Sequence, residues 1–433
     1  MSDRSDMPMD PSRMQELLRR RLTRRGLLKG AGAGVAGMSL SALLAACGEK
    51  TTGGNGGSAK IDPSTIYDGN PEEGVLEFAN WPIYIDKARG GKDYPSLEAF
   101  EKKSGIDVNY QEIIQDNAEF FGKIQPQLAA GDPPGYDIVV ITNGREFTAL
   151  TNNEWVWPLD PNGRPNFDAN AIGWAKDPAF DPGNKYSMCW QSGVTGVGIN
   201  HDLIKGEFTK FDDLMNPDIT GLDSVGMLRA DMPEFVMINL GIDPTTSGPA
   251  EWKEAAAWLQ MQKDSGVVRA YYTQGYTNDM TAGNVSATMA WSGDVLYYAL
   301  WAGYPNLEFI GPPTIGALLW IDNMLIPANA EHPDSAMKIM DYYYELEPAT
   351  MVAEWVFYMS PVNGVRDLIL KHSEEARDEG FFGYATKLAE TAESPYLFPD
   401  DEFLSHTSFG FPNWTDESAE EWDAIFSPIW QTT

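Results

Sequence analysis

Short apolar runs alternate with amphipathic stretches through the first part of the chain that follows the N-terminal region. The runs at 75–79, 106–110 and 136–141 have the length of β-strands, and the last is flanked by glycine and polar turn residues. Between them, 97–104 and 119–130 place apolar residues three or four positions apart, as amphipathic helices do. Strands that alternate with helices in this way predict an α/β fold with a parallel sheet.

A glycine-studded apolar segment, Gly193–Asn200, follows this first unit. Its glycine spacing matches neither the Walker motif nor GxGxxG, which argues against a phosphate-binding loop. We interpret it as a long strand that crosses between two lobes, because glycine permits a bend or a close approach of the backbone. A second α/β unit is predicted downstream, with its strands and helices at 224–228, 232–240, 251–263, 285–290, 308–311 and 335–346.

The N-terminal region has the character of an export signal. Thr23–Lys29 contains an arginine pair followed by apolar residues, which resembles a twin-arginine signal, and Ala31–Ala46 is too short an apolar run to span a membrane. The small residues before Cys47 resemble a lipoprotein cleavage site. We therefore expect twin-arginine export, removal of residues 1–46, acylation of Cys47, and a flexible tether over 47–70 that anchors an extracytoplasmic protein to the membrane.

The chain beyond residue 46 is strongly acidic. The whole chain has 31 Lys/Arg and 63 Asp/Glu, of which residues 1–46 hold eight and four; this leaves 23 basic and 59 acidic residues, a formal charge of −36. Nucleic acids and anionic lipid surfaces bind clustered Lys and Arg, so this balance argues against both as partners. It would attract a cationic ligand, although we expect most of the carboxylates on the solvated surface.

Cysteine and histidine give no indication of a metal or redox site. Once Cys47 is acylated, Cys189 is the remaining cysteine, so no disulfide can form within the chain. The four histidines are scattered and lack the spacing of a zinc site. We therefore expect no metal and no cofactor, and we interpret Cys189 as a small buried apolar residue rather than a nucleophile.

Seven short segments, each weak as a motif, follow one another in a characteristic order. They are Phe78–Tyr84, Tyr136–Val140, Tyr186–Asn200, Ala230–Glu234, Trp291–Asp294, Trp320–Ala330 and Tyr358–Asn363. In this order they resemble the periplasmic spermidine/putrescine-binding proteins that supply ABC importers, over residues 75–365. The resemblance implies a monomeric substrate-binding component, not an enzyme, that delivers a polyamine to a membrane permease.

The resemblance also implies a two-lobed periplasmic-binding-protein fold of type II, α/β in class, with the ligand in a cleft between the lobes. The first lobe would take residues 71–195 and 323–364, and the second 196–322 and 365–433. Hinges are expected in the crossover segments 194–198, 320–323 and 363–366. Contacts from both lobes would stabilise the closed, ligand-bound state.

A polyamine carries an ammonium at each end of a flexible alkyl chain. The ammoniums need carboxylates, which form charge-assisted hydrogen bonds, and the methylenes need flat apolar walls, such as aromatic rings whose faces also attract cations. The acids that the resemblance implies are Asp231 and Glu234 at one ammonium, Asp322 at the centre and Asp294 nearby. The aromatic box that it implies consists of Trp81, Tyr84, Trp291, Trp320 and Tyr358. Thr142 matches a serine that hydrogen-bonds the amine.

Some of these residues have a local explanation as well. Asp231 precedes a predicted helix and Glu234 follows three residues later, which is the pattern of a capping box. The tryptophans belong to a set of 14, most of which must lie in the core or on the surface. Asp322 is different, because an acid inside an apolar strand is costly unless it is paired, and a cationic ligand is one natural partner.

The chain departs from the family pattern at three positions. Pro82 and Ile83 replace a polar residue and an acid, and Gly144 replaces the tyrosine of the spermidine-type pattern. The missing acid would clamp the far ammonium of a long polyamine, so the departures favour putrescine, an agmatine-like guanidine or another cationic amine. Two alternatives stay open: the same fold with another ligand, such as iron or thiamine, and a secreted hydrolase with paired carboxylates, for which no GxSxG motif is present.

Overall fold

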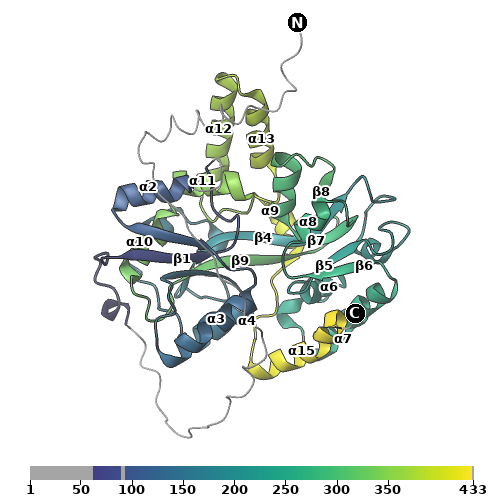
Figure 1. The fold of residues 1–433 in the computed structure, drawn as a ribbon, viewed down its shortest axis with the longest axis horizontal. Helices are drawn as coiled ribbons and strands as arrows, with labels where there is room; N and C mark the ends of the chain where they lie inside the picture. The colour runs from purple at the N-terminus through teal and green to yellow at the C-terminus, as the bar shows by residue number, and fades with distance from the viewer. Residues whose placement is uncertain (1–61, 89–92, 432–433) are drawn as a thin grey trace, which may run out of the picture.

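A computed structural model describes residues 62–88 and 93–431 of the chain. The expected export signal, Cys47 and most of the expected tether lie outside these residues. Within the described ranges, no helix combines the length and the apolar composition needed to cross a membrane. The chain folds into alternating helices and strands. The strands form one large sheet, and the helices pack around it, as Figure 1 shows.

The elements follow the alternation that the sequence predicts. The strands are β1 (Val75–Asn80), β2 (Asp107–Glu112), β3 (Ile138–Thr142), β4 (Ser187–Asn200), β5 (Val225–Leu228), β6 (Val268–Tyr272), β7 (Ala287–Trp291), β8 (Leu307–Ile310), β9 (Ala317–Leu325) and β10 (Thr407–Ser408). The helices are α2 (Pro95–Ser104), α3 (Asn117–Ala130), α4 (Arg145–Asn152), α5 (Pro165–Asn170), α6 (Met232–Asn239), α7 (Pro249–Asp264), α8 (Tyr276–Thr281), α9 (Ser292–Leu296), α10 (Pro333–Tyr342), α11 (Leu346–Val356), α12 (Val365–Asp378), α13 (Phe382–Glu393), α14 (Asp401–Ser405) and α15 (Asp416–Gln431). A π-helical turn, Tyr297–Trp301, continues α9.

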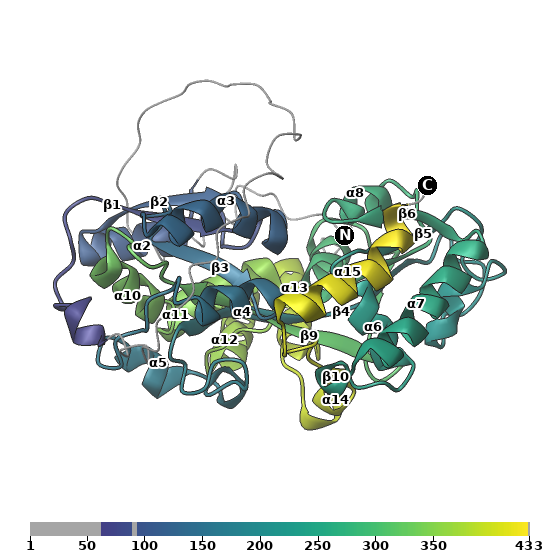
Figure 2. The ribbon, with the colours of Figure 1, turned by 90° about the horizontal axis from the view of Figure 1, so that it is seen from below.

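The sheet has the strand order β2-β1-β3-β9-β4-β7-β5-β6. Strands β1, β2 and β3 pair in parallel and form the first half of the sheet, and β5, β6 and β7 pair in parallel and form the second half. The long strands β4 and β9 run antiparallel to each other between the halves, and each also pairs antiparallel with the half beside it. Helices cover both faces of each half (Figure 2). Strand β4 is longer than predicted: it begins at Ser187, whereas the sequence predicts its start near Gly193.

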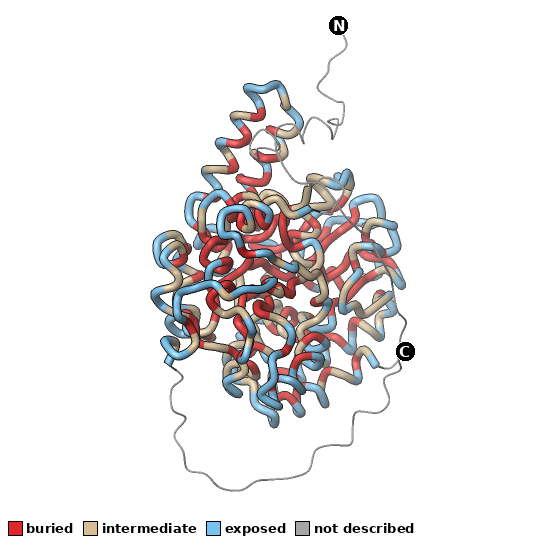
Figure 3. The backbone as a smooth tube through the Cα atoms, turned by 60° about the vertical axis from the view of Figure 1, so that its left-hand side comes forward, coloured by how far each residue is buried: buried red, intermediate tan, exposed pale blue. Residues whose placement is uncertain are grey.

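Two large groups of buried apolar side chains lie on either side of the crossover strands. The first is built mainly from residues 67–190 and 320–392, and the second mainly from 194–317 and 403–429. Figure 3 shows the buried backbone as a continuous interior that extends into the base of a protruding helical hairpin, whose tip is exposed.

The hairpin consists of α12 and α13, and its packing differs from the predicted lobe boundary at residue 365. Its buried residues Val365, Ile369, Leu388 and Ala392 belong to the first core, whereas the prediction assigned residues from 365 onward to the second lobe. The division into two lobes with hinges in the crossover segments stays a prediction, and the packing places α12 and α13 with the first half of the sheet.

Candidate functional site

The central acid of the predicted site, Asp322, lies where three strands meet. On β9 it pairs in register with Thr142 of β3 and Gln191 of β4. The Tyr84 hydroxyl donates to one carboxylate oxygen at 2.7 Å, and the Thr142 hydroxyl donates to the other at 2.6 Å. Asp322 is only 6% exposed. Burial raises its pKa to about 6; the hydrogen bonds oppose this shift, and the charge of Asp231 adds to it.

An aromatic wall stands beside this carboxylate. The Tyr358 ring packs edge-on against the rings of Tyr84 and Trp320, with centroid separations of 5.4 and 5.3 Å. A Cβ atom at Gly193 would lie 2.6 Å from Trp320 and 2.8 Å from Tyr358, and one at Gly293 would lie 2.6 Å from the Tyr358 ring. The two glycines therefore make room for the rings, which is the close approach expected of Gly193.

A second acid, Asp294 at the start of α9, is held by two tyrosines. Tyr276 donates its hydroxyl to one carboxylate oxygen at 2.7 Å, and Tyr358 donates to the other at 2.9 Å. Tyr276 also accepts the backbone N–H of Trp291 at 3.0 Å. Burial raises the pKa of Asp294, and both hydroxyl bonds oppose the shift. Sequence reasoning missed Tyr276, which is one of 18 tyrosines and lies in no recognisable motif.

Asp231 belongs to a neighbouring group on the second half of the sheet. The Trp291 indole N–H donates to one of its carboxylate oxygens at 2.9 Å, and the Thr195 hydroxyl donates to the same oxygen at 2.5 Å. Asp231 makes no side-chain capping bond to α6, so the capping-box explanation is wrong for this residue. Burial raises its pKa, and the hydrogen bonds from Thr195 and Trp291 oppose the shift.

Glu234 does not complete a capping box either. One of its carboxylate oxygens accepts the backbone N–H of Phe411 at 2.8 Å, from a segment 177 residues further along the chain. Burial raises the pKa of Glu234 to about 8; the bond from Phe411 opposes the shift, and the charges of Asp231 and Glu146 add to it. Sequence reasoning missed both Phe411 and Glu146, for which no local pattern exists.

The predicted residues are thus brought together to different degrees. Hydrogen bonds and ring contacts connect six of them in one network: Tyr84, Thr142, Asp294, Trp320, Asp322 and Tyr358. Asp231 and Trp291 form a pair that joins this network through Tyr276. Trp81 is half-buried, and its indole N–H donates to the Val140 carbonyl at 3.1 Å. It makes no hydrogen bond or ring contact with the residues of the network. Glu234 is linked to the network by electrostatics alone, because the negative charge of Asp231 raises its pKa.

The four acids share one electrostatic property. Among the ion pairs of residues 62–88 and 93–431, none involves Asp231, Glu234, Asp294 or Asp322. Buried carboxylates that lack a cation are costly to ionise, which is why the pKa of each is raised. In the same described ranges, no cluster of three His, Cys, Asp or Glu side chains could hold a metal ion.

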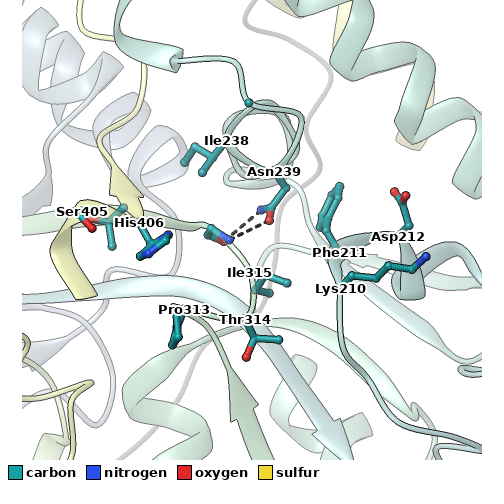
Figure 4. A pocket seen from close by; sticks show the side chains of 13 residues that line it. Lys210, Phe211, Asp212, Ile238, Asn239, Pro313, Thr314, Ile315, Ser405 and His406 are labelled. Carbon is teal, nitrogen blue, oxygen red and sulfur yellow. Dashed lines mark hydrogen bonds between the residues drawn. The ribbon is translucent and has the colours of Figure 1, made fainter. Parts of the chain in front are cut away.

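Two surface pockets lie elsewhere, at the C-terminal end of α6. The first, of about 540 Å³, is lined by Lys210, Asn239 and His406 among others, and Figure 4 shows Asn239 bonded to the backbone beside Ile315. The second, of about 500 Å³, shares Ile238 and extends toward Phe409. Neither contains a predicted ligand residue, and neither gathers unpaired acids, so the chemistry of the carboxylates defines the candidate site better than these hollows do.

Comparison with protein families gives a match over most of the folded chain. The family of bacterial extracellular solute-binding proteins matches residues 96–380. The spermidine/putrescine-binding periplasmic protein of Salmonella typhimurium is 27% identical over 309 residues, which cover 71% of this chain and 83% of that protein. The putrescine-binding periplasmic protein PotF of Escherichia coli is 27% identical over 325 residues, which cover 71% of this chain and 82% of that protein.

Solved structures share the fold. The spermidine/putrescine ABC transporter substrate-binding protein PotD of Streptococcus pneumoniae superposes with a TM-score of 0.65 at 22% identity, covering 82% of this chain and 98% of that one. The TpPotD lipoprotein of Treponema pallidum superposes with a TM-score of 0.64 at 16% identity, covering 82% and 99%. These likenesses confirm the predicted α/β periplasmic-binding-protein fold.

Proposed function

The chain belongs to the bacterial extracellular solute-binding proteins, and from this premise we propose that it binds a short polyamine between the two halves of its sheet. Members of this family are non-enzymatic components of ABC transport, so the chain is an extracytoplasmic substrate-binding protein rather than a hydrolase. The finer proposal concerns its ligand, for which putrescine is the first candidate.

The unpaired carboxylates carry this proposal. Asp322 is almost fully buried, and Asp231 and Asp294 are partly buried, yet none of them has a basic partner in the described part of the chain. Hydrogen bonds from hydroxyl and indole groups orient these acids without neutralising them. A ligand ammonium supplies the missing positive charge, and charge-assisted bonds to carboxylates are about twice as strong as neutral ones.

The aromatic rings supply the second half of the recognition. Tyr84, Trp320 and Tyr358 form a continuous wall beside Asp322. Such a wall buries the methylenes of an alkyl amine and attracts its cationic end, an interaction of about 0.5–2 kcal/mol depending on desolvation. We propose Asp322 as the central ammonium ligand, with Asp231 as a second, because its other carboxylate oxygen has no hydrogen bond within the described ranges.

The environment of Ile83 supports a short ligand. Ile83 is 52% exposed, and its backbone N–H is bound by Glu112 at 2.8 Å. The Glu112 carboxylate is itself paired with Lys87 at 2.7 Å. Glu112 is therefore already neutralised by a lysine, and it offers no free charge to the far ammonium of a long polyamine.

Calorimetric titration tests the proposed ligand class. The purified chain would be titrated at low salt with putrescine, spermidine, agmatine and an uncharged control of similar length. We expect putrescine or agmatine to bind at micromolar concentration or tighter, spermidine to bind more weakly, and the control to give no heat. The absence of heat from every amine would overturn the proposal and leave the fold with another ligand.

We also propose the finer features of localisation. The Thr23–Lys29 arginine pair and the small residues before Cys47 support twin-arginine export followed by acylation of the cysteine. A Cys47→Ser variant tests the anchor, because it removes the acylation site. We expect the wild-type chain in the membrane fraction and the variant in the soluble extracytoplasmic fraction; an unchanged distribution would show that Cys47 does not anchor the protein.

A further inference from the structure

The C-terminal strap, which we define as residues 409–414, reaches one of the site acids. It leads from β10 into α15, the yellow helix that faces the viewer in Figure 2. The Phe411 backbone N–H donates to Glu234 at 2.8 Å. A Cβ atom at Gly410 would lie 2.5 Å from the same carboxylate oxygen. The strap and the Glu234 carboxylate can therefore approach this closely only because residue 410 is glycine.

The strap is fixed on both sides of this contact. Phe409 packs against Phe180, with ring centroids 6.2 Å apart, and against the small core around Ile321. Phe411 is 7% exposed, and its ring meets Trp252 edge-on at 5.2 Å. Because both flanking side chains are packed, the Phe411 N–H has a defined position and direction.

The strap also connects the two halves of the sheet. Arg145, the first residue of α4, pairs with Asp423 of α15 at 3.1 Å, and its guanidinium lies over the Trp414 ring at 5.9 Å from the centroid. Helix α15 packs on α7 of the second half. The ion pair is exposed and contributes little energy on its own, so its effect is to orient the strap across the α4–α6 end of the site.

We propose that the strap is part of the ligand site, in which Gly410 and Phe411 are positioning residues that hold Glu234 as the acceptor for the second ammonium of a diamine. This inference rests on the proposed function, because it requires an amine in the site. One carboxylate oxygen of Glu234 is held by Phe411, and the other has no hydrogen bond within the described ranges and can accept an ammonium. The strap would thereby set the length of diamine that fits.

The charges around Glu234 give this role a recognisable pH dependence. Burial raises the pKa of Glu234 to about 8, and the two titratable groups that face it, Asp231 at the start of its own helix and Glu146 on α4, add to the rise. At pH 7 the empty site therefore holds a proton on Glu234, and a bound ammonium must displace it. The contribution of Glu234 to diamine binding should grow as the pH rises from 7 to 9.

A single added methyl group tests the inference. Gly410→Ala forces the flexible Glu234 carboxylate away from the strap at a residue whose φ is not in the left-handed region. Gly383→Ala is the matched control, because a Cβ atom there meets nothing within 4 Å. The affinities for putrescine and for butylamine, which has one ammonium and the same chain length, would be measured by calorimetry on the full-length protein at pH 7 and pH 9.

We expect Gly410→Ala to weaken putrescine about tenfold or more, in line with a lost hydrogen bond to a charged group, and to change butylamine less than twofold. Glu234→Gln, which can still accept the Phe411 N–H, should give the same selective loss and remove the gain between pH 7 and pH 9. The double variant should lose no more than either single one.

Three results would overturn the inference. Unchanged putrescine affinity in Gly410→Ala, with a loss in Glu234→Gln, would show that the strap does not position the acid. Equal losses for putrescine and butylamine would indicate a general disturbance of the site. If the wild-type protein bound no amine at all, the proposed function itself would fail, and that result is distinguishable from the other two.

Discussion

Asp322→Asn separates the proposed ligand role of this residue from a structural one. Asparagine has nearly the same shape as aspartate, and its side-chain oxygen can still accept a hydrogen bond from Tyr84 or Thr142. The substitution therefore removes the negative charge while leaving the packing on β9 nearly unchanged. If the charge serves a cationic ligand, binding and stability should change in opposite directions.

The structure sets the magnitude of both effects. Burial raises the pKa of Asp322 from 3.8 to about 6, and one pKa unit corresponds to about 1.4 kcal/mol. Ionising this side chain in the empty site therefore costs about 3 kcal/mol more than in water. An ammonium in contact with the carboxylate offsets that cost, so its loss should reduce amine affinity about a hundredfold. The empty variant should be more stable than wild type at pH 7.5 by up to about 3 kcal/mol, and this gain should shrink toward pH 4.

The assay combines calorimetric titration with chemical denaturation at pH 4.5 and pH 7.5. Asp181→Asn is the matched control: Asp181 is also buried, but it accepts hydrogen bonds from the backbone of Tyr186 and Ser187 and lies outside the site. The control should keep its amine affinity, because Asp181 makes its hydrogen bonds outside the site. An Asp322→Asn variant that binds within twofold of wild type, or that is less stable than wild type at pH 7.5, would show that the Asp322 charge does not serve a cationic ligand.

Three further predictions follow from the site and the N-terminal signal. Trp320→Ala should weaken amine binding about ten- to hundredfold by removing an apolar and cation-attracting wall. If the thermal midpoint of the empty protein falls far enough to explain the loss of amine affinity, Trp320 is a core residue rather than a ligand residue. Amine affinity should rise between pH 5 and pH 7, because Asp322 loses its proton with a pKa of about 6. Titration in buffers of different ionisation enthalpy should detect proton release on binding near pH 6. An amine affinity that does not change with pH would exclude Asp322 as an ammonium ligand. Replacing Arg24 and Arg25 with lysine should block export of the full-length chain, as followed by cell fractionation, whereas normal export would show that another route is used.

Local patterns in the sequence predict most of the elements that support the site. The apolar runs at 75–79 and 106–110 correspond to β1 and β2, and the helix predicted at 251–263 lies within α7. The spacing of apolar residues within each of these segments is enough to distinguish a strand from a helix, so a short window of sequence predicts the element. The edge strand Val268–Tyr272 was missed, because its residues are only partly buried and do not alternate clearly between apolar and polar. The helices Val365–Asp378 and Phe382–Glu393 were missed as well.

The partners of the site acids could not be read in the same way. A helix that begins after Asp231 satisfies the local rule for a capping box, yet its carboxylate points to Thr195 and Trp291 instead. Glu234 meets a backbone N–H 177 residues away. Such contacts depend on how the crossover strands bring distant segments together, and no local pattern encodes that arrangement. The resemblance to a family indicated the acids, but Tyr276, one of the two tyrosines that hold Asp294, lies in no motif.

The raised pKa values show that the empty site works against the stability of the fold. A carboxyl whose pKa is raised on folding contributes its full stability below its unfolded pKa, and that contribution is lost as the pH rises through the folded value. For Asp322 this window runs from 3.8 to about 6, and for Glu234 from 4.5 to about 8. At neutral pH the empty protein therefore bears much of this cost, which lysine or arginine partners for these acids would relieve. Such partners would also fill the place of a cationic ligand. The unpaired acids are consistent with a fold that gives up stability in its empty state to bind a cation.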